Sequence, residues 1–181
     1  MASGAALAVE IPSAPRRLLH VGCGRRALPE ELSDCDETRV DLDPSCNPDF
    51  IASMTDLRAV GEGYSAVYSS HALEHVDIRD ALQALREFRR VLAPGGAAIV
   101  LVPDLEGVLP TLDVVYECEA GPITGMDMFY GHLASLRDSP YMAHRCGFIA
   151  QTLEAAMQAA GFERIKVTRT IGRSLIAVGF A

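Results

Sequence analysis

Lysine is almost absent from this sequence of 181 residues, in which Lys166 is the only example. Lys166 lies near the carboxyl terminus in an expected strand, so the chain has no phosphate-binding loop of the Gly-Lys-Ser/Thr type. The same position excludes the Tyr-x-x-x-Lys pair that many dehydrogenases use. The scarcity of lysine therefore removes two common kinds of nucleotide-dependent enzyme.

Long apolar runs, a basic amino terminus and paired cysteines are lacking too. No apolar stretch approaches the length of a membrane span, and Glu10 ends the first apolar run too early for a secretory signal. The cysteines are odd in number and form no Cys-x-x-Cys pair, which disfavours a disulfide framework and a zinc knuckle. We therefore expect a cytoplasmic protein with reduced thiols, in which residues 1–14 are a flexible arm. The five cysteines are Cys23, Cys35, Cys46, Cys118 and Cys146.

Positive charge is scarce as well, since the formal net charge is −8. Nucleic acids and anionic membranes both favour a basic surface, so we expect neither as a partner. Arg86, Arg89 and Arg90 follow a helical pattern and are interpreted as a solvated helix face. The length suits one domain over residues 15–181, which we expect to be a monomer or a homodimer.

Short apolar segments alternate with helical patterns along most of this domain. Apolar residues at three- and four-residue steps predict a helix over 78–92, capped by Asp77, and another over 150–160. This alternation indicates an α/β fold that is Rossmann-like and doubly wound, with a mostly parallel sheet and helices on both faces. The last two strands are joined by a very short link, so the C-terminal strand must be antiparallel. Strands are expected at 16–21, 38–42, 50–53, 65–69, 97–102, 163–170 and 174–180.

Residues 104–147 depart from this alternation, being long, irregular and rich in Gly, Pro, Tyr, Met and His. A loop of this length inside a compact domain is usually a lid or a binding segment. We therefore expect a lid or substrate insert. Its apolar residues suggest an apolar or ring-shaped small molecule and are equally consistent with a lid that packs on itself. These residues are Met126, Met128, Phe129, Tyr130, Tyr141 and Met142.

A glycine turn follows the first expected strand. Gly22-Cys23-Gly24 would leave backbone amides accessible to a ligand, and Asp41 ends the second strand about 20 residues later. An acid at this separation reaches ribose hydroxyls in dinucleotide-binding folds, so the pair predicts a ligand that contains a nucleoside. A nicotinamide cofactor is disfavoured, because residues 25–37 have too little apolar periodicity for the helix that would seat a pyrophosphate.

Five short motifs follow one another along the chain: LLHVGCG at 18–24, VDLDP at 40–44, YSSHALEHV at 68–76, RRVLAPGG at 89–96 and AAGF at 159–162. Together they resemble the motifs of the class I S-adenosylmethionine-dependent methyltransferases, and most of all those of the small type 11 group. The resemblance implies an enzyme that uses S-adenosyl-L-methionine, forms S-adenosyl-L-homocysteine and acts on a small-molecule substrate.

The resemblance, which spans about residues 16–180, also implies a cofactor site. Asp41 would hold the ribose hydroxyls and Leu42 would pack on the adenine. Ser53 and Met54 stand where the family often has an acid that reads the adenine amino group. The implied cofactor-binding residues are Gly22, Cys23, Gly24, Asp41, Leu42, Ser53, Met54, Ser69, Ser70 and His71.

Three positions depart from the family's pattern. His20 replaces the acid that is common just before the first glycines, Arg26 replaces the third glycine, and Ser53 replaces the adenine-binding acid. An acid in place of His20 often supports the amino end of the cofactor. A non-catalytic module that binds a nucleoside or S-adenosylmethionine is therefore an alternative function.

Residues 71–75 (HALEH) also match the His-x-x-Glu-His pattern of inverted zinc peptidases. Histidines four apart on a helix share a face and could bind zinc, with Glu74 as the general base. The segment directly follows a buried strand and precedes the helix cap Asp77, however, and nothing in the sequence marks a third ligand. A zinc hydrolase that uses His71, Glu74 and His75 is a lesser alternative, and no metal site is assigned.

In the methyltransferase interpretation, the sulfonium methyl group passes to a nucleophile by in-line displacement, and the protein's main task is to position the reactants. A general base contributes when the nucleophile carries a proton, and histidine suits this role because its ordinary pKa lies near neutrality. The first candidate is His71, at the expected cofactor edge. Further catalytic candidates lie in the insert, namely Tyr130, His132 and His144.

Overall fold

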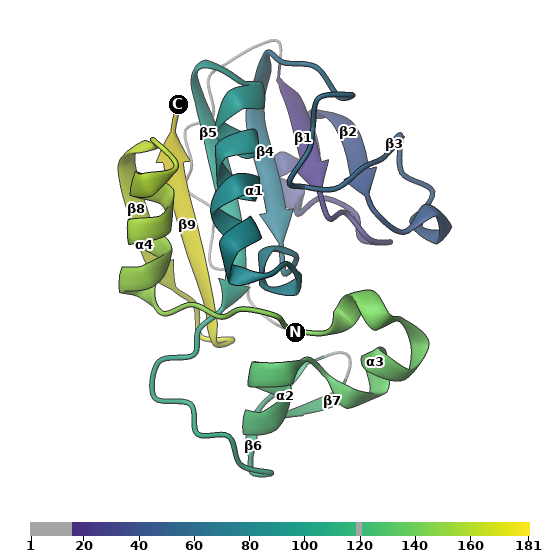
Figure 1. Ribbon diagram of the computed structural model, residues 1–181, viewed down its shortest axis with the longest axis vertical. Coiled ribbons are helices and arrows are strands. Elements are labelled where there is room, and N and C mark those ends of the chain that lie inside the picture. The colour runs from purple at the N-terminus through teal and green to yellow at the C-terminus, as the bar shows by residue number, and fades with distance from the viewer. Residues whose placement is uncertain (1–15, 119–120) are drawn as a thin grey trace.

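The computed structural model describes residues 16–118 and 121–181, so the arm expected at 1–14 lies outside the described residues. A seven-stranded sheet forms the centre, with the order β3-β2-β1-β4-β5-β9-β8 (Figure 1). Strands β1 to β5 pair in parallel, whereas β9 is antiparallel to both β5 and β8, as predicted. The strands are β1 (Arg17–Val21), β2 (Asp36–Asp41), β3 (Phe50–Ile51), β4 (Tyr64–Ser70), β5 (Leu92–Pro103), β8 (Glu163–Arg169) and β9 (Ser174–Phe180).

The central strands carry apolar residues on both faces of the sheet. In β1, Leu18 packs into the core on one face and Leu19 into the core on the other, and both are fully buried. Val67 in β4 and Ile99 in β5 are likewise buried, on opposite faces. Near-continuous apolar runs of this kind are typical of parallel strands that are covered on both sides.

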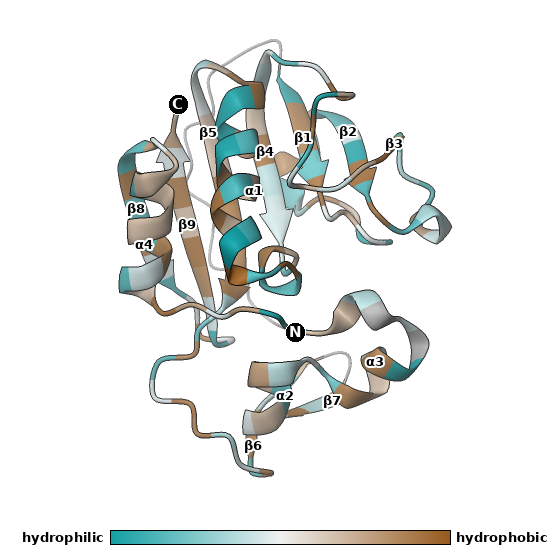
Figure 2. Cartoon of the chain, in the orientation of Figure 1, coloured by the Kyte–Doolittle hydropathy of each residue, from teal (hydrophilic) through white to brown (hydrophobic). Residues whose placement is uncertain are grey.

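Two long helices, α1 (Ile78–Val91) and α4 (Ala150–Ala159), lie on the same face of the sheet and contact each other (Figure 1). The buried side of α1 includes Leu85 and Phe88, and its outward side is hydrophilic (Figure 2). Asp77 caps this helix, as predicted, by accepting a hydrogen bond from the backbone of Arg79. Within the described part of the chain, no helix combines the length and apolar character needed to cross a membrane.

Among the described residues, the second face of the sheet carries a shorter helical segment than the first. Beside β1 the other face is covered by residues 28–35, which form one turn of 3₁₀ helix, η1 (Glu30–Leu32). Pro29 and several acidic residues interrupt the apolar pattern here, so the segment lacks the stripe that a longer helix would bury. Leu28 and Leu32 still pack against Leu18 and Tyr68, which closes this part of the core.

Residues 104–118 and 121–147 form a small unit below the carboxyl ends of the parallel strands (Figure 1). The unit is more ordered than the irregular loop that we expected, because Val108, Ile123 and Met128 form a core of its own. A capping box between Thr124 and Asp127 begins its first helix. Its elements are β6 (Val114–Cys118), β7 (Gly121–Thr124), α2 (Gly125–Tyr130), α3 (Leu133–Asp138) and the 3₁₀ helix η4 (Pro140–Met142).

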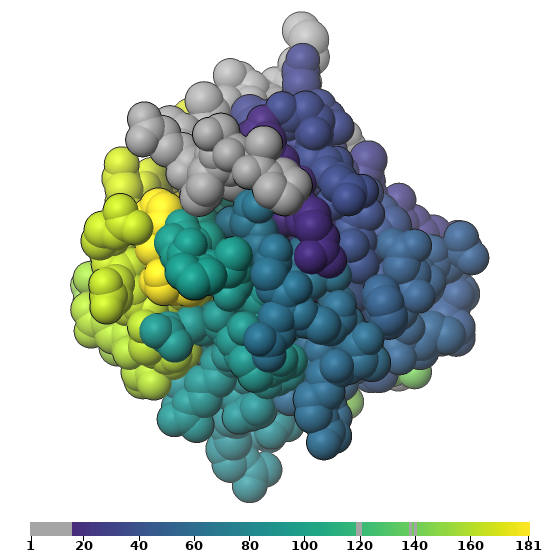
Figure 3. All heavy atoms as spheres, turned by 90° about the horizontal axis from the view of Figure 1, so that it is seen from above, coloured from purple at the N-terminus to yellow at the C-terminus, as the bar shows by residue number. Residues whose placement is uncertain are grey.

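The strand order places a topological switch point between β1 and β4. Seen from above, α4 and β9 lie toward one edge of the molecule and β2 and β3 toward the other, with the insert almost hidden beneath (Figure 3). In open α/β sheets, ligands bind outside the carboxyl ends of the strands at such a point. The insert therefore faces the position where the fold favours a ligand.

Candidate functional site

A cavity of about 810 Å³ opens at the carboxyl ends of β1, β2 and β4. Its lining residues come from four stretches of the chain, 20–29, 41–55, 68–80 and 139–145. The first three stretches follow parallel strands, and the fourth belongs to the insert. A volume near the upper end of the usual range for small-ligand sites, about 300–1,000 Å³, has room for a cofactor and a second small molecule.

The glycine turn after β1 forms one wall of this cavity. Gly22 and Gly24 have φ values of +67° and +51°, which favour glycine. A Cβ atom on Gly22 would lie 2.3 Å from the Cβ of Ala72, so this glycine allows two strand-ending loops to pack closely. A Cβ on Gly24 would meet no described atom within 4 Å. Gly22 therefore shapes the turn, and the space beside the Cα of Gly24 is free of other described atoms.

Asp41 points toward this turn, as the sequence predicts. Its Oδ2 accepts a hydrogen bond of 2.7 Å from the backbone N–H of Gly24, and its Oδ1 accepts one of 2.9 Å from Asp43. Arg39 supports the turn from the other side by donating to the carbonyl of Gly24 at 2.7 Å. Because each carboxylate oxygen can accept more than one hydrogen bond, Asp41 can still receive hydroxyl groups from a ligand.

The loop after β2 and the segment after β3 form the next wall. Leu42 is 51% exposed, and its side chain lines the cavity together with Met54. Ser53 also lines the cavity, but its hydroxyl lies 2.8 Å from that of Thr55 and is already engaged. These contacts suit a flat apolar ring better than one that needs a carboxylate partner.

His20, which replaces the family's usual acid, is 2% exposed and turned toward β2. Its Nδ1 lies 2.7 Å from Oε1 of Glu37, and its ring meets the ring of Tyr68 edge-on. Burial lowers the pKa of His20 despite the opposing effect of Glu37. Burial also raises the pKa of the neighbouring Cys23 thiol to about 11, so this thiol is protonated at neutral pH. Neither group supplies the charge that an acid would place here.

Three expected cofactor residues, Ser69, Ser70 and His71, lie at the end of β4, and they do not all reach the cavity. Ser70 and His71 line the cavity. Ser69 is fully buried and is not among the lining residues, so its assignment to the cofactor edge is corrected. The physical reason is that neighbouring residues of a strand point to opposite faces, so Ser69 and Ser70 cannot both reach one side of the sheet.

His71 stands between the cavity and a buried carboxylate. Its φ of +51° is uncommon for a residue other than glycine, and strained backbone of this kind often occurs at functional sites. Its Nδ1 lies 3.4 Å from Oε1 of Glu74, and its Nε2 lies 3.3 Å from the hydroxyl of Ser174. Burial acts to raise the pKa of Glu74, but the contact with His71 and the positive potential of His75 outweigh it and lower that pKa. A carboxylate that orients an imidazole at a cavity wall is the arrangement of a histidine base.

The insert candidates do not converge on this cavity. Tyr130 and His132 line a separate hollow of about 610 Å³ beside α2 and α3, so their assignment to the reaction zone is corrected. His144 lies behind the cavity wall, with its Nδ1 2.9 Å from the carbonyl oxygen of Met128. The reason is the insert's own fold, which its local core and capping box impose and which periodicity did not reveal.

Other residues, which sequence reasoning did not assign to the site, line the cavity instead. Arg145 follows the insert helices, and Arg25 and Arg26 follow the glycine turn. His75, which had a role only in the zinc hydrolase alternative, also lines the cavity. Among the apolar insert residues, Tyr141 and Met142 line it. Proximity to the recognised motifs is the one sequence signal that points to Arg25, Arg26 and His75.

The His-x-x-Glu-His pattern does not form the shared helical face that a zinc peptidase needs. His71 precedes the 3₁₀ helix η3 (Leu73–His75), and its side chain is directed toward Ser174. The Nδ1 of His75 lies 3.1 Å from the carbonyl oxygen of Ala143 in the insert. The two histidines of the pattern are therefore held by different parts of the protein.

The strand order, the antiparallel β9 and the glycine turn paired with an acid define a Rossmann-like fold of the methyltransferase type. A SAM-dependent methyltransferase from Mesorhizobium loti is similar, with a TM-score of 0.63 and 14% identity over 91% of this chain and 90% of that one. The CcbJ methyltransferase from Streptomyces caelestis matches at a TM-score of 0.61 and 14% identity, over 93% and 84% of the two chains. A SAM-dependent methyltransferase from Archaeoglobus fulgidus matches at 0.60 and 12%, over 93% and 87%. At such identities the likeness establishes the fold.

The chain belongs to the methyltransferase domain family, whose model matches residues 1–167, and it is therefore a methyltransferase. Some structural neighbours are much longer than this chain. For example, the chain spans 50% of an O-methyltransferase family protein from Burkholderia thailandensis. No curated protein matches this sequence.

Proposed function

We propose that this methyltransferase transfers the methyl group of S-adenosyl-L-methionine to a small-molecule acceptor by in-line displacement. S-adenosyl-L-homocysteine is the second product. The observation that carries the proposal is the position of Asp41, whose carboxylate accepts a hydrogen bond from the backbone of Gly24 on the wall of a large cavity. The pairing supports the proposal because a carboxylate that can accept two ribose hydroxyls would lie beside a turn with little side-chain bulk.

The cofactor would lie along the carboxyl ends of β1 and β2. Its ribose would bind Asp41, its adenine would pack between Leu42 and Met54, and its methionyl part would follow the glycine turn. His20 lines the cavity at the position where the family often has an acid for the cofactor's amino end, and its Nδ1 is engaged by Glu37. Asp41 is therefore the main polar anchor in this proposal.

The acceptor would bind between His71 and the part of the insert that lines the cavity. Tyr141 and Met142 offer an apolar surface there, which supports an apolar or ring-shaped small molecule. The net charge of −8 disfavours RNA or DNA, which would enter a strongly repulsive field.

Catalysis would depend mainly on alignment, because the sulfonium methyl is already activated. Holding the acceptor atom in line with the methyl–sulfur bond can contribute about 7–11 kcal/mol. In this proposal His71 would accept a proton from the acceptor, since it lines the cavity and lies beside the carboxylate of Glu74. Histidines His132 and His144 and Tyr130 are not proposed for this step, because they do not line the cavity.

Calorimetric titration of the purified chain with S-adenosyl-L-methionine tests the cofactor site. We expect one site per chain and a loss of about 100-fold in affinity, about 2.7 kcal/mol, in Asp41→Ala. The matched control is Asp36→Ala, which removes an exposed carboxylate from the opposite end of the same strand. Unchanged affinity in Asp41→Ala, or an equal loss in both variants, would mean that the ribose is placed wrongly.

Turnover on a panel of acceptors tests the proposed acceptor class. The chain should form S-adenosyl-L-homocysteine with at least one member of a panel of phenols, amines, thiols and carboxylic acids with apolar or aromatic bodies. Tight cofactor binding without turnover on such a panel, together with turnover on RNA or protein, would overturn the proposed acceptor class.

A further inference from the structure

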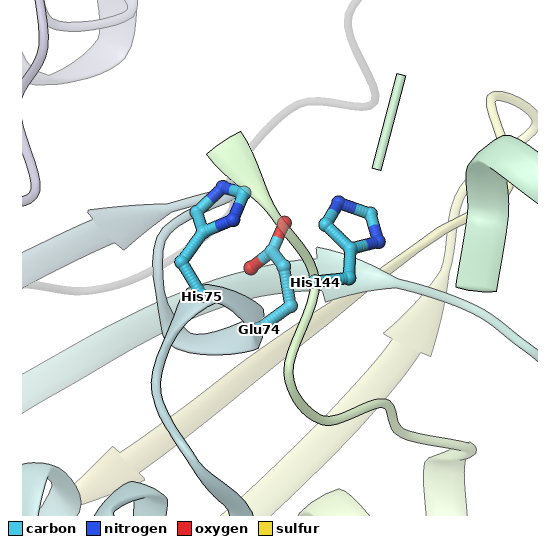
Figure 4. A group of neighbouring side chains, drawn as sticks. All are labelled: Glu74, His75 and His144. Atoms are coloured by element: carbon cyan, nitrogen blue, oxygen red, sulfur yellow. The ribbon is translucent and has the colours of Figure 1, made fainter. Parts of the chain in front are cut away.

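A cluster of three side chains joins the insert to the sheet domain, behind the wall of the proposed active site. Glu74 and His75 come from η3, and His144 comes from the end of the insert. One ring nitrogen of each histidine and one carboxylate oxygen all lie within 4.8 Å of one another. The Glu74 carboxylate lies between the two imidazole rings (Figure 4), whose centroids are 5.2 Å apart.

The backbone fixes the tautomer of both histidines. The Nδ1 of His75 lies 3.1 Å from the carbonyl oxygen of Ala143, and the Nδ1 of His144 lies 2.9 Å from that of Met128. A carbonyl oxygen only accepts, so each Nδ1 must carry a proton and donate it. In the neutral ring, Nε2 then presents a lone pair. Histidines that bind metals commonly donate their other ring N–H to a carbonyl in this way.

The carboxylate between the rings is incompletely satisfied. Glu74 is 1% exposed, and its Oε1 lies 3.4 Å from Nδ1 of His71. Its Oε2 has no hydrogen-bond partner among the described residues. A buried carboxylate oxygen without a donor carries a large desolvation cost, which a bound cation would offset. Two imidazole rings and a buried carboxylate with an unpaired oxygen therefore lie around one small volume.

We propose that Glu74, His75 and His144 form a binding site for one divalent transition-metal ion, with Zn²⁺ as the best-matched ion. Two imidazoles and one carboxylate are a ligand set that zinc accepts, and three protein ligands leave a coordination position open. Zinc–ligand distances of about 2.0–2.2 Å require ligand atoms closer together than 4.8 Å, so the side chains must rotate inward on binding.

The ion would tie the insert to the domain. The backbone N–H groups of Arg145 and Cys146 already donate to the carbonyl oxygen of Glu74, at 2.8 and 3.2 Å. A metal bond from His144 to the same η3 turn would reinforce this junction. His75 also lines the cavity, so the open coordination position would lie beside the acceptor side of the proposed active site.

Titration of chelator-treated protein with Zn²⁺, followed by calorimetry and elemental analysis after desalting, tests the site. We expect one Zn²⁺ per chain with micromolar or tighter affinity, and a loss of at least about 10- to 100-fold in both His75→Gln and His144→Gln. His132→Gln is the matched control, because it changes a histidine of the same insert that lies outside the cluster. Zn²⁺ should also slow hydrogen exchange at the amides of Arg145 and Cys146 in the wild type but not in His144→Gln.

Two results would overturn the site: the absence of saturable Zn²⁺ binding by the folded wild type, or binding whose affinity survives in both His75→Gln and His144→Gln. Circular dichroism of each variant establishes that it is folded. His144→Gln carries the test if the change at His75 prevents folding, because His144 belongs to the insert. Titration with S-adenosyl-L-methionine in the presence of chelator shows whether the cofactor binds without the metal. A failure of the metal proposal can therefore be distinguished from a failure of the proposed function.

Discussion

The two sides of the proposed active site are built in different ways. The cofactor side consists of turns that directly follow buried parallel strands, so Gly24 and Asp41 are held by the sheet itself. The acceptor side comes from an insert whose own core is centred on Val108, Ile123 and Met128. Its last residues join the domain through backbone hydrogen bonds to Glu74.

This difference suggests a division of labour between a rigid wall and an adaptable one. Strand ends that belong to a large core unfold only with the whole domain, whereas a small unit with few buried apolar residues can unfold locally. A cofactor shared by many enzymes is bound by residues in a fixed geometry. An acceptor that differs between enzymes is bound by a segment whose sequence can vary. Four substitutions or comparisons test whether the two sides differ as described.

The largest expected effect compares His71, at the wall of the cavity, with His132, in the insert. His71→Gln should lower kcat by about 10²- to 10⁴-fold if the acceptor carries a proton, because His71 is the histidine oriented by Glu74 at the cavity wall. His132→Gln, in the separate hollow of the insert, should leave kcat nearly unchanged. Both are measured at saturating cofactor, so that altered cofactor affinity does not enter. Equal losses in the two variants would place the reaction zone in the insert.

The next effect compares one methionine from each core. Met157→Ala should reduce the free energy of unfolding by about 2–5 kcal/mol, because its side chain is fully buried in the main core. Met128→Ala empties the small core of the insert, where Met128 is 3% exposed. We expect it to leave both global unfolding in urea and S-adenosyl-L-methionine binding little changed, while turnover falls. A similar loss of global stability in both variants would show that the insert and the domain unfold as one unit.

A smaller effect compares two glycines with similar backbone angles. Gly22 has φ +67° and Gly107, at the start of the insert, has φ +70°. Alanine at either position costs about 1–2 kcal/mol for the left-handed backbone. Gly22→Ala should cost about 1–3 kcal/mol more, because its Cβ would lie 2.3 Å from that of Ala72. Equal midpoints of urea unfolding for the two variants would mean that the loop at Ala72 moves aside freely.

The smallest effect is the pH dependence that His20 gives to the rigid side. Burial lowers the folded-state pKa of His20, so on acidification the unfolded chain binds the proton first. Stability from this residue is present above its unfolded pKa of about 6.5 and is lost as the pH falls toward the folded value, by at most about 1.4 kcal/mol per pH unit. Urea unfolding of the wild type and of His20→Asn at pH 7.5 and 5.5 measures it. The wild type should lose more stability than the variant, and an equal loss would contradict the assignment.

The local features of this protein followed from its sequence alone. Periodicity and capping located α1 with its cap Asp77, and alternation of apolar segments indicated a mostly parallel sheet. The glycine turn and Asp41 were placed on one edge, because the ends of parallel strands meet there whatever the details of packing. These features depend on residues that are close in sequence or on rules common to all such sheets.

The tertiary structure alone decided which distant segments meet. The insertion of β9 between β5 and β8, the burial of Ser69 and the separate hollow around His132 all depend on packing that no local pattern records. The same holds for the meeting of Glu74 and His75 with His144, which the fold of the insert brings back to η3. A sequence records residue types and spacing, whereas contacts between remote residues are set by how whole elements bury their apolar surfaces against one another.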